Sequence, residues 1–215
     1  ASSDFESEAF QRRIGDGDAA VEYYTQRGDF KDDTTWIGQP WGQFVLAAAS
    51  LGAFGHGTLQ ARWPFALCGV LTVVALWLFV RRWFDDALLA TLAALLLVGN
   101  VYWVLHMRQC RYYAPACLFL FLTFTTYLDW QGGRRWSRWL FLATAWVWFQ
   151  FDYGSFWPVM GILGLDSLLR QRRSLANTLG TFALLALLVT PWFFYYELLA
   201  RAKESFLPRP YQALG

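Results

Sequence analysis

The sequence has few of the residues that bind metals or form disulfides. It contains three cysteines and two histidines among 215 residues. Cys68, Cys110 and Cys117 all lie in or beside apolar stretches, and no two of them form a CxxC pair. This spacing argues against a disulfide framework and a zinc site, and it indicates buried free thiols. His56 and His106 are equally isolated, so we expect no metal site.

The chain also lacks a strong excess of charge of either sign. It has 18 Lys and Arg residues against 16 Asp and Glu, a formal net charge of +2, which gives no reason to expect a nucleic acid partner. Instead, 56% of the residues are hydrophobic and 13 are tryptophan, more than is usual in a soluble domain. Many tryptophans lie at the ends of apolar stretches, where their rings favour the headgroup region of a bilayer. We therefore expect an integral membrane protein in contact with lipid.

About six apolar stretches follow a polar head of about sixty residues, and a spanning helix needs about 20 apolar residues. The stretches cover residues 63–80, 87–105, 113–128, 139–151, 155–169 and 175–196. The two on either side of Asp152 are short, and we predict two helices joined by a tight turn. The predicted fold class is all-α: a polytopic membrane helix bundle with about six transmembrane helices.

Three short connectors between these stretches are rich in arginine. They contain Arg81, Arg82, Arg134, Arg135, Arg138, Arg170, Arg172 and Arg173. The positive-inside rule places such connectors in the cytoplasm. The head, the turn around residues 108–111, the turn at Asp152 and the tail after Glu197 would then be extracytoplasmic.

The predicted organisation has three parts. Residues 1–60 form an extracytoplasmic loop with two interfacial helices, at 18–26 and 44–54, because the second apolar run is too short to span. Residues 61–197 form the transmembrane bundle, and residues 198–215 begin another extracytoplasmic loop. No apolar segment precedes the head in this sequence, so we expect a membrane helix or a cleaved signal peptide before residue 1.

Acidic residues are concentrated in the head. Asp4, Glu6 and Glu8 lie within one short segment. Such a run usually forms a solvated surface. The alternative is a set of carboxylates held near the lipid headgroups, where one of them acts as a general base.

Two arginines lie on the outer side, where the loop charge bias does not predict basic residues. Arg108 and Arg111 are three residues apart, and Tyr112 and Tyr113 follow them. Each arginine either extends to the interface with no further role or binds an anionic headgroup. Because a guanidinium binds phosphate through two parallel hydrogen bonds, a lipid phosphate is the natural ligand.

Asp152 and Tyr153 lie in the outer turn between two apolar stretches. Aspartate is favoured at helix N-caps, so Asp152 either caps the next helix or shares a cavity with the head acids. Carboxylates and a phosphate-binding arginine on one face are what membrane-embedded sugar transfer needs. A base takes a proton from an acceptor hydroxyl, and the arginine stabilises the departing lipid phosphate.

Several short motifs occur in the order seen in a known superfamily. Residues 6–10, the run Gly38 to Trp41, the pair Phe54 and Gly55, and residues 62–64 precede the turn at 108–113, the Asp152 turn and a Pro-Trp pair at 191–192. This order resembles the GT-C superfamily of polytopic glycosyltransferases. It is similar to the dolichyl-phosphate-mannose protein mannosyltransferases of glycosyltransferase family 39 and to the lipid A aminoarabinose transferases, with this chain as part of their N-terminal membrane region.

The resemblance implies roles for residues of this sequence. The family has an Asp-Glu-Ala segment, which Ser7, Glu8 and Ala9 match with serine at the acid usually assigned as catalytic. Glu8 is then the expected base, followed by Glu6 and Asp4. Arg111, with Arg108 and Tyr113, would contact the donor phosphate, and Asp152 and Tyr153 would line the cavity.

The resemblance implies an enzyme that moves a hexosyl or pentosyl group from a polyprenyl-phosphate donor to a protein, lipid or glycan acceptor. The reaction would invert the configuration at the sugar carbon. It would take place on the extracytoplasmic face of a multi-pass protein of the cell envelope, in a prokaryotic plasma membrane. Some relatives bind a divalent cation through acids of this loop, but no ligand set is visible here. We expect no cofactor. Two alternatives stay open: a transporter or flippase of an anionic lipid-linked substrate, although no internal repeat is visible, and a non-catalytic membrane scaffold.

Overall fold

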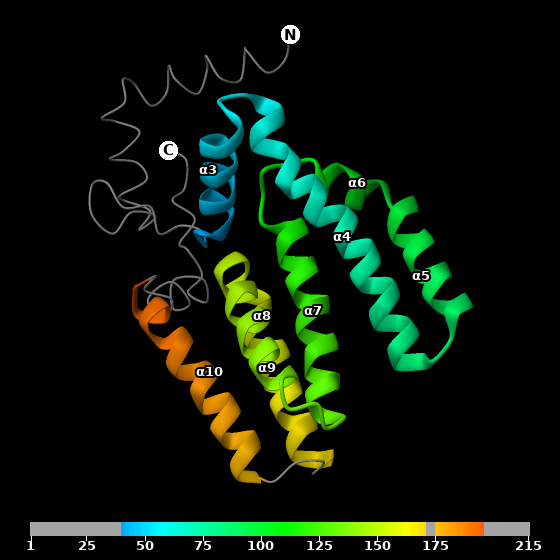
Figure 1. Cartoon of the computed structure of the whole chain (residues 1–215), viewed down its shortest axis with the longest axis vertical. Coiled ribbons are helices and arrows are strands. Elements are labelled where there is room, and N and C mark those ends of the chain that lie inside the picture. Colours follow the sequence, from blue (N-terminus) through cyan, green and yellow to red (C-terminus); the bar gives the residue numbers. More distant parts are fainter. Residues whose placement is uncertain (1–39, 171–174, 196–215) are drawn as a thin grey trace, which may run out of the picture. The chain divides into compact units, whose positions relative to one another are not determined.

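A computed structural model describes residues 40–170 and 175–195 of the chain, and every regular element in these ranges is an α-helix (Figure 1). The helices are α3 (Gly42–Phe54), α4 (Thr58–Phe84), α5 (Ala87–Gly99), α6 (Val101–Met107), α7 (Tyr113–Gln131), α8 (Ser137–Phe151), α9 (Tyr153–Arg170) and α10 (Leu175–Tyr195). The predicted all-α class is confirmed. The head acids, the helix predicted at 18–26 and the tail from residue 198 lie outside the described residues.

The predicted apolar stretches correspond closely to the observed helices, with one exception. The stretch 87–105 forms two helices, α5 and α6, which are bent by 69° at Asn100. The Asn100 side chain accepts a hydrogen bond from the Trp103 backbone N–H (3.1 Å) and so caps α6. Asparagine is a favoured N-cap residue, and here it starts a new helix inside an apolar run.

Two of the described helices, α4 and α10, are long and apolar enough to cross a membrane, and the bent pair α5 and α6 raises the number to three if it counts as one span. Length and composition therefore support two or three of the six expected spans. The 15 residues of α8 extend about 22 Å, which is less than the roughly 30 Å hydrocarbon core. Both α7 and α9 are longer, but each carries an aspartate (Asp129 and Asp166) near its C-terminal end.

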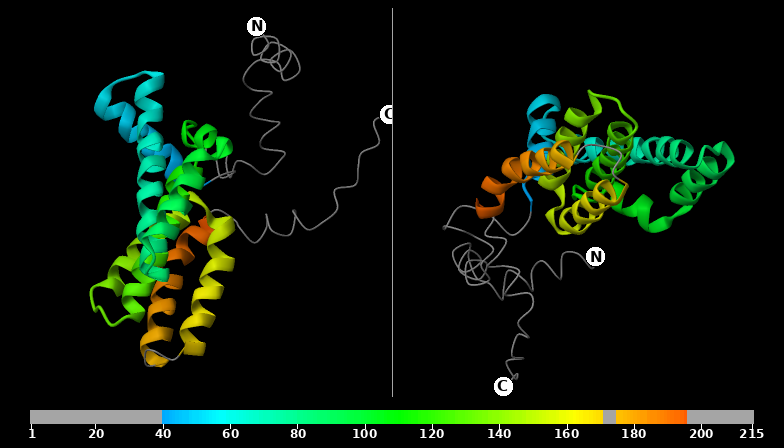
Figure 2. Two further views of the ribbon diagram at one scale, coloured as in Figure 1. Left: turned by 90° about the vertical axis from the view of Figure 1, so that its right-hand side faces the viewer. Right: turned by 90° about the horizontal axis from the view of Figure 1, so that it is seen from below.

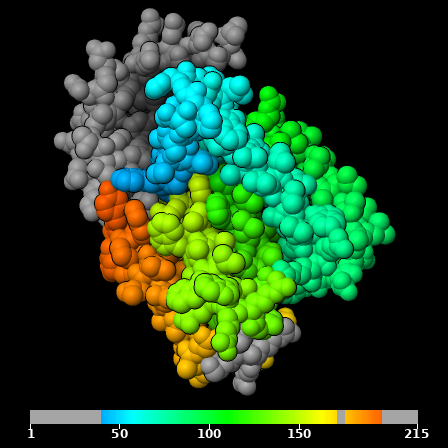
Figure 3. All heavy atoms as spheres, in the orientation of Figure 1, coloured from blue at the N-terminus to red at the C-terminus, as the bar shows by residue number. Residues whose placement is uncertain are grey.

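The 13-residue α3 is apolar but short, as predicted for the segment 44–54. Its first turn packs closely on the end of α8: a Cβ atom at Gly42 would lie 2.6 Å from the Gln150 carbonyl oxygen. Figure 3 shows α3 and α4, in blue and cyan, against the green atoms of α7 and α8 on one face of the compact unit Pro40–Pro191.

Aromatic side chains fill the contact between α7, α8 and α10. The rings of Trp130 and Phe141 stack at 5.7 Å, and the Phe182 ring lies 5.9 Å from that of Phe141. Trp130 and Phe141 are completely or almost completely buried. Two views show α9 and α10 side by side (Figures 1 and 2), and a Cβ atom at Gly164 would lie 3.8 Å from the Phe182 ring.

Large apolar side chains cover the outer surfaces of these helices. Leu59, Leu96 and Leu169 are 73%, 77% and 74% exposed. Several threonine hydroxyls inside the bundle instead donate to backbone carbonyls one turn earlier, as Thr123 does to Phe119 (2.6 Å). An apolar exterior around helices whose backbone groups are paired is the arrangement that lipid requires.

The helices α4, α7 and α9 all run toward one end of the compact unit, where Arg82, Arg134 and Arg170 are found. We call this the arginine end. The opposite end contains the first turn of α3, the turn at 108–112 and the α8–α9 junction at Asp152. We call it the Asp152 end.

Candidate functional site

The turn between α6 and α7 is held in place by α3 and α4. The Tyr112 backbone N–H donates to the buried Gln43 side chain (3.1 Å), and the Cys110 thiol donates to the Ala61 carbonyl oxygen (3.3 Å). The approach of α6 to α4 depends on Gly69, where a Cβ atom would lie 2.6 Å from the Met107 Cβ. The local structure thus fixes Arg108 and Arg111 beside the start of α4.

A cavity of about 480 Å³ lies between this turn and α4, and three arginines line it. Arg108 and Arg111 were predicted as phosphate ligands, and the structure places both in the lining together with Arg62 of α4. All three side chains are exposed, and none forms an ion pair with a carboxylate in the described part of the chain. The cavity therefore carries three positive charges that are available to an anion.

Arg62 was not predicted as a site residue. It appeared only as part of the Arg-Trp-Pro match at the start of a span. Its role depends on a contact between segments almost fifty residues apart, which Cys110 and Ala61 make. The available signal was an arginine at the beginning of an apolar stretch, two residues before Pro64.

Two tyrosines follow the cavity-lining Arg111 directly in the chain. The rings of Tyr112 and Tyr113 lie 4.4 Å apart, and the His106 ring meets that of Tyr113 edge to face at 4.8 Å. Burial, followed by the hydrogen bond to Tyr113 and the negative charge of Asp152, raises the pKa of Tyr112 to about 12, although Arg111 acts in the opposite direction. The Tyr112 hydroxyl is thus protonated at neutral pH and can donate a hydrogen bond.

Asp152 caps α9. One carboxylate oxygen accepts hydrogen bonds from the backbone N–H groups of Gly154 (3.0 Å) and Ser155 (3.2 Å), and the other accepts from the Ser155 hydroxyl. Tyr153 begins α9, and its ring lies 6.4 Å from that of Phe149. Because the Asp152 charge also acts on Tyr112, the capping carboxylate lies at the same end of the bundle as the arginine-lined cavity.

The cap can be separated from the charge by two substitutions. Asp152→Ala is expected to lower the free energy of unfolding by about 1 kcal/mol, because the first turn of α9 loses its acceptor. Asp152→Asn keeps an acceptor oxygen and is expected to unfold like the wild type. Thermal unfolding of the full-length protein in detergent compares the two, and equal losses for both would contradict the capping role.

The structure does not bring the predicted base candidates to this cavity, since Asp4, Glu6 and Glu8 lie outside the described residues. Within residues 40–170 and 175–195, no group of three or more His, Cys, Asp or Glu side chains is placed to hold a metal ion. The described part of the site therefore offers the positive charge of three arginines to an anion.

Comparison with known proteins agrees with this geometry. A family model described as dolichyl-phosphate-mannose-protein mannosyltransferase matches residues 39–196, which is more than half of the chain and includes all the described helices. Neither the curated proteins nor the solved structures give a match. The apolar helices and the match together identify an integral membrane glycosyltransferase. The chain belongs to the dolichyl-phosphate-mannose-protein mannosyltransferase family.

Proposed function

We propose that the protein transfers a sugar from a polyprenyl-phosphate donor to a hydroxyl-bearing acceptor on the extracytoplasmic face of the membrane. The observation that carries the proposal is the cavity at the Asp152 end, where Arg62, Arg108 and Arg111 converge without a described carboxylate. A guanidinium keeps its charge at all relevant pH values and binds two phosphate oxygens at once. The family relationship makes a lipid-linked sugar phosphate the expected anion.

In the proposed reaction, a head carboxylate accepts the proton of the acceptor hydroxyl, with Glu8 as the first candidate and Glu6 and Asp4 behind it. The acceptor oxygen forms a bond to the sugar carbon while the bond from that carbon to the phosphate oxygen breaks. The electron pair leaves with the lipid phosphate, whose additional negative charge the three arginines stabilise. A single displacement of this kind inverts the configuration at the sugar carbon.

Two neighbouring groups support this assignment. The protonated Tyr112 can donate to a phosphate or a sugar hydroxyl, and Tyr113 lies against it. Both belong to the turn that carries Arg111, so a donor bound by the arginines would also meet the aromatic pair. Asp152 contributes mainly by capping the start of α9, and its carboxylate is an alternative candidate for the base.

The substitution Arg62→Gln tests whether α4 contributes to donor binding. Full-length protein in membranes would be supplied with a panel of radiolabelled polyprenyl-phosphate sugars. We expect Arg62→Gln to raise KM for the accepted donor about tenfold with a smaller effect on kcat, since a hydrogen bond to a charged group contributes roughly 1.5–3 kcal/mol.

Arg135→Gln is the matched control, because Arg135 is exposed and lies outside this cavity. It should leave KM unchanged. An unchanged KM in Arg62→Gln as well would remove α4 from the donor site, and no turnover of any donor by the wild type would contradict the proposed function.

A further inference from the structure

A second cavity, of about 590 Å³, lies at the arginine end of the bundle. Three separate segments contribute an arginine to its lining: Arg82 from the last turn of α4, Arg134 from the connector after α7, and Arg170 from the end of α9. Trp83 and Asp129 also line it. The arginine-rich connectors predict positive charge here, but they do not predict that the charges meet around one hollow.

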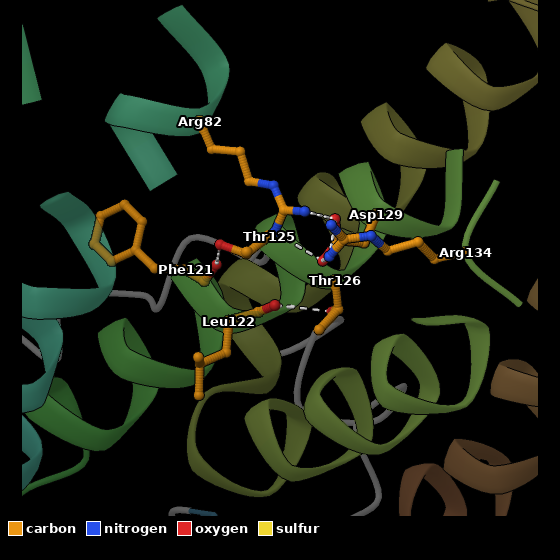
Figure 4. Close-up of polar contacts among 7 residues, drawn as sticks. All are labelled: Arg82, Phe121, Leu122, Thr125, Thr126, Asp129 and Arg134. Atoms are coloured by element: carbon orange, nitrogen blue, oxygen red, sulfur yellow. Dashed lines mark hydrogen bonds and ion pairs between the residues drawn. The ribbon is translucent and has the colours of Figure 1, made fainter. Parts of the chain in front are cut away.

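Asp129 neutralises only part of this charge (Figure 4). Its carboxylate pairs with the Arg82 guanidinium, and one hydrogen bond between them measures 2.8 Å. Arg134 reaches the same carboxylate through Nη1 alone, which lies 3.5 Å from both oxygens, and its side chain is 68% exposed. Because a guanidinium has five N–H donors, Arg134 keeps most of its donors for a ligand.

Contacts with Asp166 and Trp83 orient the Arg170 side chain. Its Nε donates to one oxygen of Asp166 (2.5 Å), and the other oxygen accepts from the buried Tyr127 hydroxyl (2.8 Å). The guanidinium carbon lies 5.9 Å from the centre of the Trp83 ring. These contacts use the Nε–H and one face of the group, while its two terminal nitrogens form no hydrogen bond or ion pair with a described residue.

The charges around the cavity do not cancel. Three guanidinium groups face one carboxylate in the lining, and the second carboxylate, that of Asp166, stands behind Arg170. Two further acids, Asp85 and Asp86, follow α4, but neither lines the cavity, and Asp86 uses its side chain to accept from the first N–H groups of α5. An anion of one or two charges would balance the remaining excess.

Apolar side chains beside the cavity are open to the surroundings of the bundle. Trp83 is 43% exposed, and its neighbour Phe84 is 58% exposed. Leu169, which precedes Arg170, is 74% exposed. A ligand with an anionic head and an apolar tail would fit this combination better than a fully polar one.

We propose that the cavity at the arginine end binds the phosphate of an anionic phospholipid headgroup, with Arg134 and Arg170 as its principal ligands. Basic pockets between membrane helices bind such headgroups, and each basic residue near the bilayer surface contributes measurably. This site shares no residue with the donor cavity at the Asp152 end and goes beyond the proposed transfer reaction. A lipid held between α4, α7 and α9 would link the ends of these three helices.

The test measures which lipid stays with the purified protein. Full-length protein would be incubated with equal amounts of phosphatidylglycerol and phosphatidylcholine in detergent, washed, and analysed by mass spectrometry. We expect the wild type to retain phosphatidylglycerol preferentially. Arg134→Gln should reduce this preference by about fivefold, with a further reduction in Arg134→Gln combined with Arg170→Gln.

Arg135→Gln is the control, because it removes the same charge from the same connector without touching the lining. Arg134 is largely exposed, so the single variant tests the site even if the double variant does not fold. Equal retention of the two lipids by the wild type, or an equal loss in Arg135→Gln, would overturn the proposal. Millimolar inorganic phosphate should not displace the lipid; displacement that depends on Arg134 would assign the site to a soluble phosphate and overturn the lipid assignment.

Discussion

Replacing Arg111 with alanine is expected to lower kcat for sugar transfer by about 10²–10³, the loss seen when one donor to a developing negative charge is removed. Arg111 lines the cavity at the Asp152 end, and its positive charge also acts on Tyr112 in the same turn. As the bond to the sugar breaks, the phosphate gains negative charge, so an arginine contributes more to the transition state than to the bound donor.

Arg111→Lys should fall between the wild type and the alanine variant, because lysine keeps the charge but loses the paired hydrogen bonds. Neither variant should unfold more easily, since Arg111 is exposed and forms no ion pair with a described carboxylate. Radiolabelled donor consumption by the full-length protein measures the effect, with Arg135→Ala as the control at the arginine end. Full activity in Arg111→Ala would remove the phosphate role from this turn.

Glu8→Gln is expected to lower kcat by about 10²–10⁴, the usual contribution of a positioned general base. Glutamine has nearly the same shape as glutamate, but it cannot take the proton from the acceptor hydroxyl at neutral pH. The KM for the donor should change little, because the proposed phosphate contacts are made by arginines in a different part of the chain.

Glu6→Gln and Asp4→Asn are the matched controls in the same segment. Wild-type transfer in Glu8→Gln would assign the base to Glu6, Asp4 or Asp152, and the variant with the large loss would identify it. A flippase would move its lipid at the normal rate in all of these variants. A scaffold would show no turnover with or without the substitutions.

Much of the fold follows from local features of the sequence. The apolar stretches predicted the helix positions because each is bounded by a polar or flexible residue, as Asp86 begins α5 and Gly132 ends α7. The capping role of Asp152 could also be predicted, because aspartate is favoured at the N-cap position of a helix.

The break at Asn100 and the number of spans were harder to predict. Hydropathy averages over a window, so one polar residue inside the run 87–105 did not interrupt the predicted span. In the structure, the cap that Asn100 makes with Trp103 bends the chain by 69°. The counts differ because α8 is short and α7 and α9 each carry an aspartate, and the expected six included the short stretches on either side of Asp152.

The candidate site was partly predictable for a different reason. Arg108 and Arg111 belong to one turn, so their spacing revealed them, whereas Arg62 joins them only through tertiary contacts of α4. The same applies to the arginine end, where Arg82, Arg134 and Arg170 come together from three distant segments. A sequence shows the charge of each connector, but packing decides which charges face one cavity.

The most direct test of the central claim is the ratio of sugar transferred to polyprenyl phosphate released. The full-length protein would be given the one donor it consumes, and both products would be quantified in the same reaction. We predict one released polyprenyl phosphate for each transferred sugar, with both products lost together in Arg111→Ala. Movement of intact donor across the membrane without release of polyprenyl phosphate would contradict a transferase and favour a flippase.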